Sequence, residues 1–214
     1  MKEIKFKNVV PKVFSTVQDL QSDVWGKDIL FERGGLYLVE AESGKGKSTF
    51  CSYITGYRHD YSGDILFDNE NITTYKADKW AGLRRKNISL LFQELRLFPE
   101  LTAIENVMIK NQLTGYTDRH TIISWFEQLG IADKIENKVG LMSFGQQQRV
   151  AMMRALAQPF DIILADEPIS HLDDENAQIM TELMLQEARK QGAGVIVTSI
   201  GKHVNLKYDR VVRL

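Results

Sequence analysis

Short apolar runs alternate with segments of helical periodicity along most of the chain. Residues 36–39, 88–92, 161–165 and 194–198 are apolar and bounded by turn-forming or polar residues, which predicts short buried strands. A last short strand is expected over 208–213. The segments between the later strands place apolar residues three and four positions apart, as one face of a helix requires. Strands that alternate with helices indicate an α/β core with a mainly parallel sheet, in which ligands bind at the carboxyl ends of the strands.

The N-terminal part of the chain has a different pattern. Between residues 3 and 40, apolar pairs and triplets at 4–6, 9–10, 13–14 and 29–31 alternate with turns, and Gly34-Gly35 marks the last turn before the strand at 36–39. Residues 61–67 add one more strand of the same kind. This pattern predicts an antiparallel β subdomain at the entrance to the α/β core.

Residues 100–140 are expected to be mostly helical. Thr102 and Glu105 have the spacing of a capping box, and an apolar stripe over 118–129 predicts a second helix that ends at Gly130. Ser143 is a suitable N-cap for a further helix that runs to about residue 157. The helices therefore form an inserted subdomain between two parts of the α/β core.

The stretch from Ala41 to Thr49 carries the clearest chemistry in the sequence. It follows a predicted strand and precedes a predicted helix over 49–55. Glycines let the backbone wrap an anion closely, and the helix N-terminus adds its positive dipole end at the same place. Lys47 is expected to reach the β- and γ-phosphates of a nucleotide, and the Ser48 hydroxyl to hold Mg²⁺. The candidate phosphate-binding residues are Ala41, Glu42, Ser43, Gly44, Lys45, Gly46, Lys47, Ser48 and Thr49.

Two adjacent carboxylates, Asp166 and Glu167, end the strand at 161–165. We expect Asp166 to lie in the Mg²⁺ shell and Glu167 to activate the attacking water, because a cation lets the two negative groups sit side by side. The alternative is an acidic turn after a strand. A phosphate loop earlier in the same α/β pattern favours the catalytic interpretation.

Composition limits the partners and the compartment. The 214 residues carry a net charge of −1, so no global charge attracts nucleic acid or an anionic membrane. No apolar stretch approaches the roughly 20 residues of a membrane span, and the N-terminal segment has no secretory signal pattern. The single cysteine, Cys51, is expected to pack in the interior of a protein in a reducing compartment. We expect the cytosol.

Several further motifs resemble those of ATP-binding-cassette (ABC) ATPases. The signature segment (residues 142–151), beginning Met142-Ser143-Phe144-Gly145-Gln146, resembles the family signature and precedes Asp166 at the family's separation. Phe92-Gln93 resembles the family's glutamine loop, and residues 169–173 resemble its D-loop. The resemblance covers about residues 4–214 and is strongest to the ATPase subunits of macrolide export, lipoprotein release and cell division. We expect a P-loop NTPase core in one domain, with residues 1–95 and 158–214 as the core and about 96–157 as the helical subdomain.

The resemblance implies an ATPase that works as a head-to-tail dimer with Mg²⁺. ATP on one phosphate loop would meet Ser143, Gly145 and Gln146 of the other copy. Glu167, Gln93 and Lys47 would act in catalysis, and Gln93 would contact Mg²⁺ or water. A separate transmembrane subunit would hold the protein at the cytoplasmic face of the membrane, and no nucleic acid is expected. Phe14 is a candidate for stacking on adenine, with core packing as the alternative role.

Three positions depart from the family pattern. Ala41 replaces the first glycine of the phosphate loop, Phe144 replaces a signature glycine, and Ser199 stands where the family has its switch histidine. A serine cannot share positive charge with a γ-phosphate, so slow hydrolysis is expected. His171 and His203 are candidate substitutes, with an exposed loop histidine as the alternative for each. A nucleotide-gated binding module without appreciable hydrolysis is the second hypothesis. A soluble ABC ATPase of DNA repair or translation is the third, and the chain has neither the coiled-coil insertion nor the second cassette typical of that class.

Overall fold

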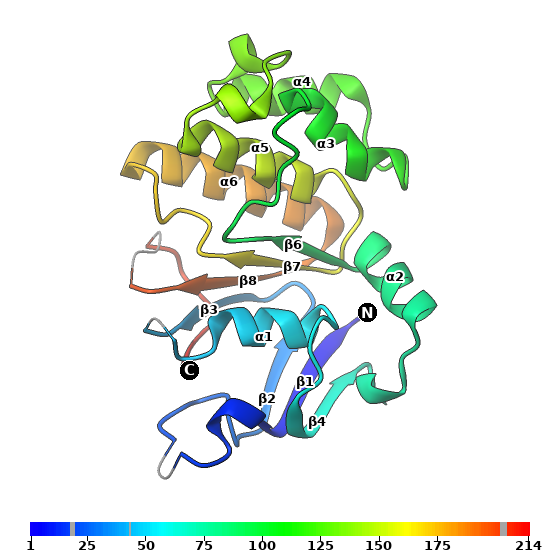
Figure 1. Cartoon of the computed structure of the whole chain (residues 1–214), viewed down its shortest axis with the longest axis vertical. Coiled ribbons are helices and arrows are strands. Elements are labelled where there is room, and N and C mark those ends of the chain that lie inside the picture. Colours follow the sequence, from blue (N-terminus) through cyan, green and yellow to red (C-terminus); the bar gives the residue numbers. More distant parts are fainter. Residues whose placement is uncertain (18–19, 43, 202–204) are drawn as a thin grey trace.

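The computed structural model describes residues 1–17, 20–42, 44–201 and 205–214 (Figure 1). Its strands are β1 (Glu3–Pro11), β2 (Ile29–Glu32), β3 (Leu36–Glu40), β4 (Tyr61–Phe67), β5 (Glu70–Asn71), β6 (Ile88–Leu91), β7 (Ile162–Asp166), β8 (Gly194–Ser199) and β9 (Arg210–Arg213). Its α-helices are α1 (Lys47–Ile54), α2 (Ala77–Lys86), α3 (Ala103–Gln112), α4 (Arg119–Gln128), α5 (Phe144–Leu156) and α6 (Asp174–Gln191).

The strands form two sheets, as the sequence predicts. Strands β6, β7, β8, β3 and β9 lie side by side in that order, and every neighbouring pair is parallel. Strands β2, β1, β4 and β5 form the antiparallel sheet at the N-terminal end of the fold. The fold is therefore that of a P-loop NTPase with an antiparallel β subdomain and an inserted helical subdomain.

The parallel sheet is buried on both faces. Along β7, Ile162 and Leu164 face one apolar core, and Ile163 and Ala165 face the other. Because side chains alternate across a strand, a run that is apolar at every position belongs between two covered layers. Figure 1 shows these layers, with α1 and the antiparallel sheet below the parallel sheet and α3 to α6 above it.

Aromatic rings fill the lower core. Phe50 of α1 stacks on Phe6 of β1 at 5.3 Å between ring centroids and meets Phe31 of β2 edge-on at 5.5 Å. Trp25 lies edge-on to Phe50 and Tyr53. This packing fixes α1, and therefore the loop before it, against the antiparallel sheet.

The predicted helix caps form as expected. Thr102 and Ser143 each begin a helix with a complete capping box, in which the hydroxyl accepts from the third helical residue and that residue's side chain accepts in return. Residues 96–157 contain α3, α4 and α5, and their assignment as a separate subdomain with those limits stays a proposal. Within the described ranges, no helix is long and apolar enough to cross a membrane.

Two local predictions differ from the structure. Lys12–Phe14 forms a 3₁₀ turn rather than part of a strand. Helix α2 was not predicted, because Trp80 is its only buried residue and the rest of its sequence is mostly charged or small. An apolar periodicity cannot show a helix that buries a single side chain.

Candidate functional site

The predicted phosphate loop, residues 41–49, joins the end of β3 to the first turn of α1, which is the placement that the sequence predicts. Gly44 and Gly46 adopt φ angles of 82° and 101°, in the left-handed region that glycine enters without steric cost. Ala41 is not among the described residues with positive φ, so the missing Gly at this position causes no backbone strain. Its N–H donates to Ser199 O at 3.0 Å, which ties the loop to the end of β8. Ser43 lies outside the described residues.

Lys47 is buried and points back along its own loop. Its ammonium donates to Ala41 O at 2.9 Å and to Glu42 O at 3.2 Å. The same nitrogen lies 3.6 Å from Glu167 Oε1, and both side chains are less than one-tenth exposed. The loop carbonyls and the carboxylate therefore hold the positive charge inside the ring of backbone that an anion would occupy.

Asp166 ends β7 at the edge of the sheet where β3 and β6 also end. The Thr198 hydroxyl donates to Asp166 Oδ1 at 2.5 Å. Burial raises the pKa of Asp166, and the Thr198 hydrogen bond and the Lys47 charge oppose that rise. A carboxylate that is desolvated and lacks a full counter-charge is well suited to receive a cation.

Glu167 follows in an uncommon backbone conformation. Its φ is 50°, in the left-handed region, which turns the chain sharply after β7. The Gln93 amide donates to Glu167 Oε2 at 3.2 Å, and the Glu167 N–H donates to Thr198 Oγ1 at 3.2 Å. Burial also raises the pKa of Glu167 above its ordinary value, against the lowering effect of Lys47. A carboxylate with a raised pKa is a stronger base toward water.

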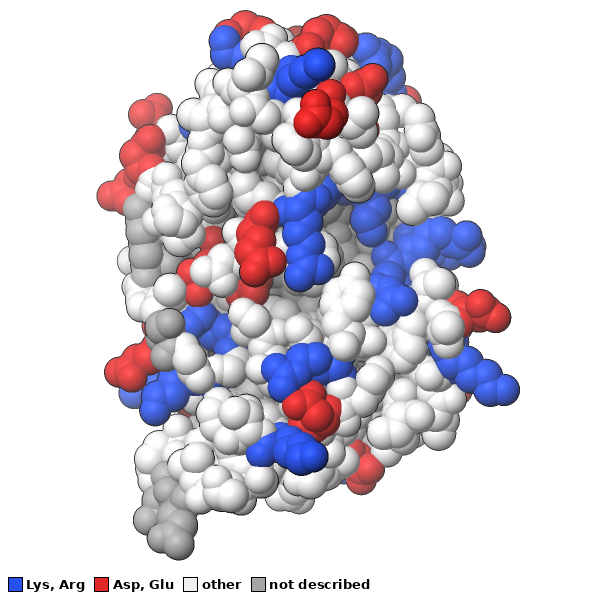
Figure 2. Space-filling model, viewed as in Figure 1, with Lys and Arg blue, Asp and Glu red and all other residues white. Residues whose placement is uncertain are grey.

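Two neighbouring pockets open beside these residues. The first has a volume of about 230 Å³ and is lined by Gly44, Gly46, Lys47, Ser48, Thr49, Gln93, Glu167 and Ile200. The second, of about 300 Å³, is lined by Ser48, Cys51, Ser52, Thr55, Tyr57, Leu90, Phe92, Gln93, Glu94, Arg96 and Asp166. Ser48 and Gln93 belong to both pockets. Figure 2 shows the surface hollowed in the middle of the face, with Lys and Arg side chains gathered around the hollow.

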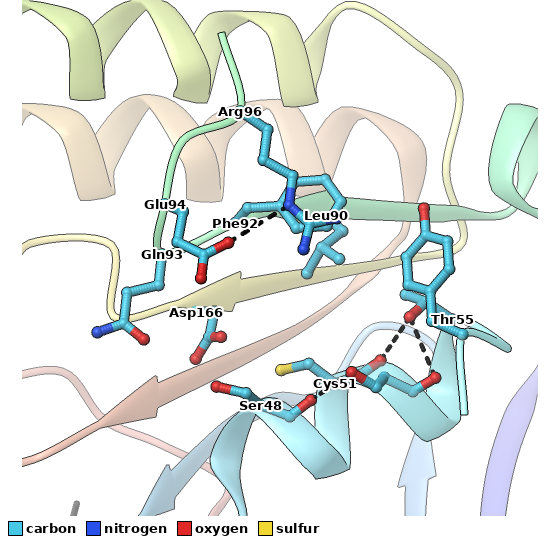
Figure 3. A pocket seen from close by; sticks show the side chains of 11 residues that line it. Ser48, Cys51, Thr55, Leu90, Phe92, Gln93, Glu94, Arg96 and Asp166 are labelled. Carbon is cyan, nitrogen blue, oxygen red and sulfur yellow. Dashed lines mark hydrogen bonds and ion pairs between the residues drawn. The ribbon is translucent and has the colours of Figure 1, made fainter. Parts of the chain in front are cut away.

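The residues predicted to hold Mg²⁺ face one another in the second pocket. Ser48 from α1, Gln93 after β6 and Asp166 from β7 surround the same space in Figure 3. Hydroxyl, amide and carboxylate oxygens are the donors that Mg²⁺ prefers, with water and phosphate completing its octahedron. Within the described ranges, no three His, Cys, Asp or Glu residues form a metal cluster. The donor set therefore fits a cation that arrives with a phosphate-bearing ligand.

The signature segment lies apart from this group. Ser143 caps α5, and Gly145 lies so close to Leu172 that a Cβ at this position would lie 3.3 Å from Leu172 Cδ2. None of the described residues lining the two pockets belongs to the signature segment. The ring of Phe144 meets His171 edge-on at 4.7 Å between centroids, so this side chain is directed at the D-loop of its own chain.

The structure describes Ser199 and one of the two histidines that were candidates to replace the switch histidine. Ser199 is 1% exposed, and its hydroxyl accepts from the Gly201 N–H at 2.9 Å. His171 is exposed as expected, and its charge lowers the pKa of Glu167, although burial of that carboxyl has the larger, opposite effect. His203 lies outside the described residues.

Sequence reasoning missed several groups of the site. Thr198 bridges Asp166 and Glu167, and the only signal for it was a hydroxyl at the end of an apolar strand. Arg58 donates to Thr49 Oγ1 at 2.9 Å, and the Trp25 indole donates to Lys45 O at 3.4 Å.

Phe14 and Cys51 lie close to the same loop. Phe14 is partly buried against the lower core and lies beside Gly46, where an added Cβ would meet its ring at 3.1 Å. Cys51 is buried as expected, and burial raises the pKa of its thiol well above the ordinary value.

Comparison with known proteins gives a consistent result. The family model described as "ABC transporter" matches residues 28–170. An uncharacterized ABC transporter ATP-binding protein of Mycobacterium tuberculosis is 32% identical over 217 residues, which cover all of this chain and 65% of that protein. The chain thus spans about two thirds of the length of that relative. The lipoprotein-releasing system ATP-binding protein LolD of Syntrophus aciditrophicus is 30% identical over 192 residues, 88% of this chain and 86% of LolD.

Solved structures extend the likeness to the whole fold. The dimeric structure of MJ0796, a bacterial ABC transporter cassette, has a TM-score of 0.82 and 27% identity, and the match covers 99% of this chain and 94% of the cassette. The same cassette in a post-hydrolysis dimer bound to ADP and Pi has a TM-score of 0.81 and 26% identity.

Proposed function

The chain belongs to the ABC transporter family, and we propose that it is an ATP-binding subunit that hydrolyses Mg-ATP to drive a membrane transport complex. One observation carries the proposal. The side chains that meet around the adjoining pockets come from the start of α1, the end of β6 and the end of β7, and the pockets have a size that suits phosphates and a cation: Lys47, Gln93, Asp166 and Glu167.

Each of these side chains has a part in the proposed reaction. Lys47 would exchange its ion pair with Glu167 for the phosphates, which frees the Glu167 carboxylate to take a proton from water. Gln93, already bonded to Glu167, would orient that water. Ser48, Gln93 and Asp166 would hold Mg²⁺, which when bound neutralises charge on the phosphate oxygens.

A second copy of the chain would complete the site. None of the described residues lining the two pockets comes from the signature segment, so Ser143, Gly145 and Gln146 are available to a nucleotide on a neighbouring molecule. The capped N-terminus of α5 offers backbone N–H groups and a positive dipole end to a γ-phosphate. The dimeric form of the MJ0796 cassette supports this arrangement. A separate membrane-spanning subunit would bind the dimer at the cytoplasmic face of the membrane.

Steady-state ATP hydrolysis by the parent protein, Glu167→Gln and Lys47→Ala tests the proposal. Glu167→Gln should lower kcat by about 100-fold or more while ATP still binds, because the base is lost and the amide keeps the shape. Lys47→Ala should lose ATP binding itself. Glu182→Gln, a change to an exposed carboxylate of α6 that accepts from the Gln178 amide, is the matched control and should match the parent.

A nucleotide-gated binding module is the second candidate function. The observation that favours it is Ser199, a buried serine whose hydroxyl accepts a hydrogen bond from its own loop at the position of the family's switch histidine. Equal ATPase rates for the parent and Glu167→Gln, together with ATP-dependent dimerisation of both, would establish the module and exclude the enzyme.

A further inference from the structure

Helix α5 connects two regions that differ in function. Ser143, its N-cap, begins the helix at the signature segment, and Arg154 lies in its last turn. Arg154 lies eleven positions after Ser143, about 16 Å along a helix axis. Helix α5 is continuous between these two residues, and a rigid helix can carry a displacement from one of its ends to the other.

The Arg154 guanidinium is buried and has an unusual set of partners. Its Nη1 donates to Arg96 O at 2.6 Å, and its Nη2 donates to Leu95 O. Within the described part of the chain, no carboxylate lies within ion-pairing distance of it, and burial lowers the pKa of Arg154 to about 10. Burial and, after it, the Arg154 charge lower the pKa of Lys110, so this neighbour is a cation and offers Arg154 no counter-charge. The two carbonyl oxygens are therefore what compensates the burial of this charge.

The carbonyl oxygens belong to the glutamine loop, here residues 92–96. Leu95 and Arg96 adopt φ angles of 58° and 50°, two consecutive left-handed conformations that side chains with a Cβ disfavour. This geometry presents the neighbouring carbonyls of Leu95 and Arg96 to the planar guanidinium of Arg154. An arginine can donate to both carbonyls at once with a fixed geometry, and a lysine cannot. Arg154 thus holds the loop in a conformation that it would not keep alone.

The same loop carries Gln93, whose amide donates to Glu167 Oε2. On the outer side of the loop, Arg96 Cζ lies 4.1 Å from the centroid of the Phe92 ring, and Arg96 Nε lies 3.6 Å from Glu94 Oε2 (Figure 3). These contacts join the end of the loop to its beginning. Leu95 N donates to Phe92 O at 3.0 Å, which joins the left-handed residues to the segment that bears Gln93. A shift of Leu95 therefore changes the aim of the Gln93 amide.

We infer that Arg154 is a positioning residue that locks the glutamine loop to the end of α5, so that phosphate capture at Ser143 and the alignment of Gln93 are a single movement. The inference rests on the proposed function, in which a neighbouring copy's nucleotide reaches Ser143. The guanidinium cannot leave the two carbonyls without stranding its charge in the interior, so helix and loop move together.

Hydrogen exchange measured by mass spectrometry tests the lock without hydrolysis. In the parent protein, Mg-ATP should slow the exchange of amides in residues 143–148 and in residues 93–98 together. In Arg154→Met, residues 93–98 should exchange about tenfold faster than in the parent and gain no protection from Mg-ATP, while residues 143–148 are still protected. Arg154→Lys, which keeps the charge and fold but lacks the fork, should restore part of the protection.

Arg149→Met is the matched control. Arg149 also lies on α5 and donates to Leu129 O, away from the loop, so its loss should leave the exchange of residues 93–98 unchanged. If Mg-ATP protects both segments in Arg154→Met as it does in the parent, the inference is wrong. If Mg-ATP protects neither segment in the parent, the proposed function fails and the inference falls with it.

A double-mutant cycle on ATP hydrolysis separates positioning from a general loss of structure. Gln93→Ala and Arg154→Lys should each lower kcat about tenfold, with KM for ATP changed less than threefold. The double variant should be no worse than Gln93→Ala alone, because Arg154 acts through Gln93. Losses that multiply, or a change confined to KM, would overturn the inference.

Discussion

Burial of Asp166 and Glu167 raises the pKa of both carboxyl groups, and this has a consequence for stability. Between its ordinary pKa and its raised value, each group binds more protons in the folded state than in the unfolded chain. The stability of the folded protein without nucleotide therefore falls as the pH rises through that window. The two charged carboxylates, which would attract a cation, therefore lower the stability of the folded protein without nucleotide.

Asp166→Asn should therefore stabilise the nucleotide-free protein at pH 7. We expect Tm to rise by about 2–4 °C, the shift that ~1 kcal/mol produces in a chain of this size, because the desolvated charge is removed. The difference should vanish at a pH below the ordinary value of 3.8, where the carboxyl is protonated in both states. Calorimetry at both pH values checks this.

Asp133→Asn is the control for that measurement. Asp133 is exposed, and the hydrogen bond from Lys134 lowers the pKa of its carboxyl, so its removal should not raise Tm. A Tm of Asp166→Asn below that of the parent at pH 7 would contradict the argument. Mg-ATP should reverse the order, since the charged Asp166 carboxylate would bind the cation more strongly than a neutral amide at the same position.

Ser199→His should raise the rate of ATP hydrolysis. An imidazole at the end of β8 can donate a hydrogen bond to a γ-phosphate, and one such donor is worth about tenfold or more in kcat. Ser199→Asn, which adds a polar side chain of smaller size without a titratable charge, is the control. A rate that stays equal to the parent's, or drops, would show that Ser199 is not what limits hydrolysis.

At the scale of the element, the two capping boxes have the same geometry but different neighbours. Thr102 begins α3, which packs against α5 and takes no part in the pockets. Ser143 begins α5 at the signature segment. The two serve as a matched pair, because each hydroxyl stabilises its helix in the same way and only one is proposed to meet a nucleotide.

Thr102→Ala and Ser143→Ala should each lower the free energy of unfolding by about 1 kcal/mol, the usual value of an N-cap. Only Ser143→Ala should also abolish the increase in mass that Mg-ATP produces in a Glu167→Gln background, measured by light scattering. Equal association of the two variants would remove Ser143 from the composite site.

The order of elements and the outline of the site follow from local patterns. A β-strand that is buried at every position, such as β7, indicates the parallel sheet, and the spacing from Ala41 to Thr49 predicts a phosphate loop between a strand and a helix. Helix α2 is not predicted by these local patterns because tertiary contact around Trp80, rather than an apolar face, holds it in place.

Other parts of the site depend on contacts between distant segments. Thr198 gains its role only when β8 pairs with β7, and the left-handed turn at Leu95 meets Arg154 only when α5 packs beside it. No window of sequence contains both members of either pair, which is why reasoning along the chain could not find them.

At the scale of the whole molecule, the single cysteine of the sequence can report on the accessibility of the interior around α1. The structure contains one cysteine, on α1 directly behind the phosphate loop, and its thiol is both shielded and neutral at physiological pH. Alkylating reagents attack the thiolate, so labelling of Cys51 should be slow while the thiol stays buried and protonated. Because Cys51 also lines the pocket beside Ser48 and Asp166, the labelling half-life of the unmodified protein reports how far that pocket and the start of α1 open to a reagent.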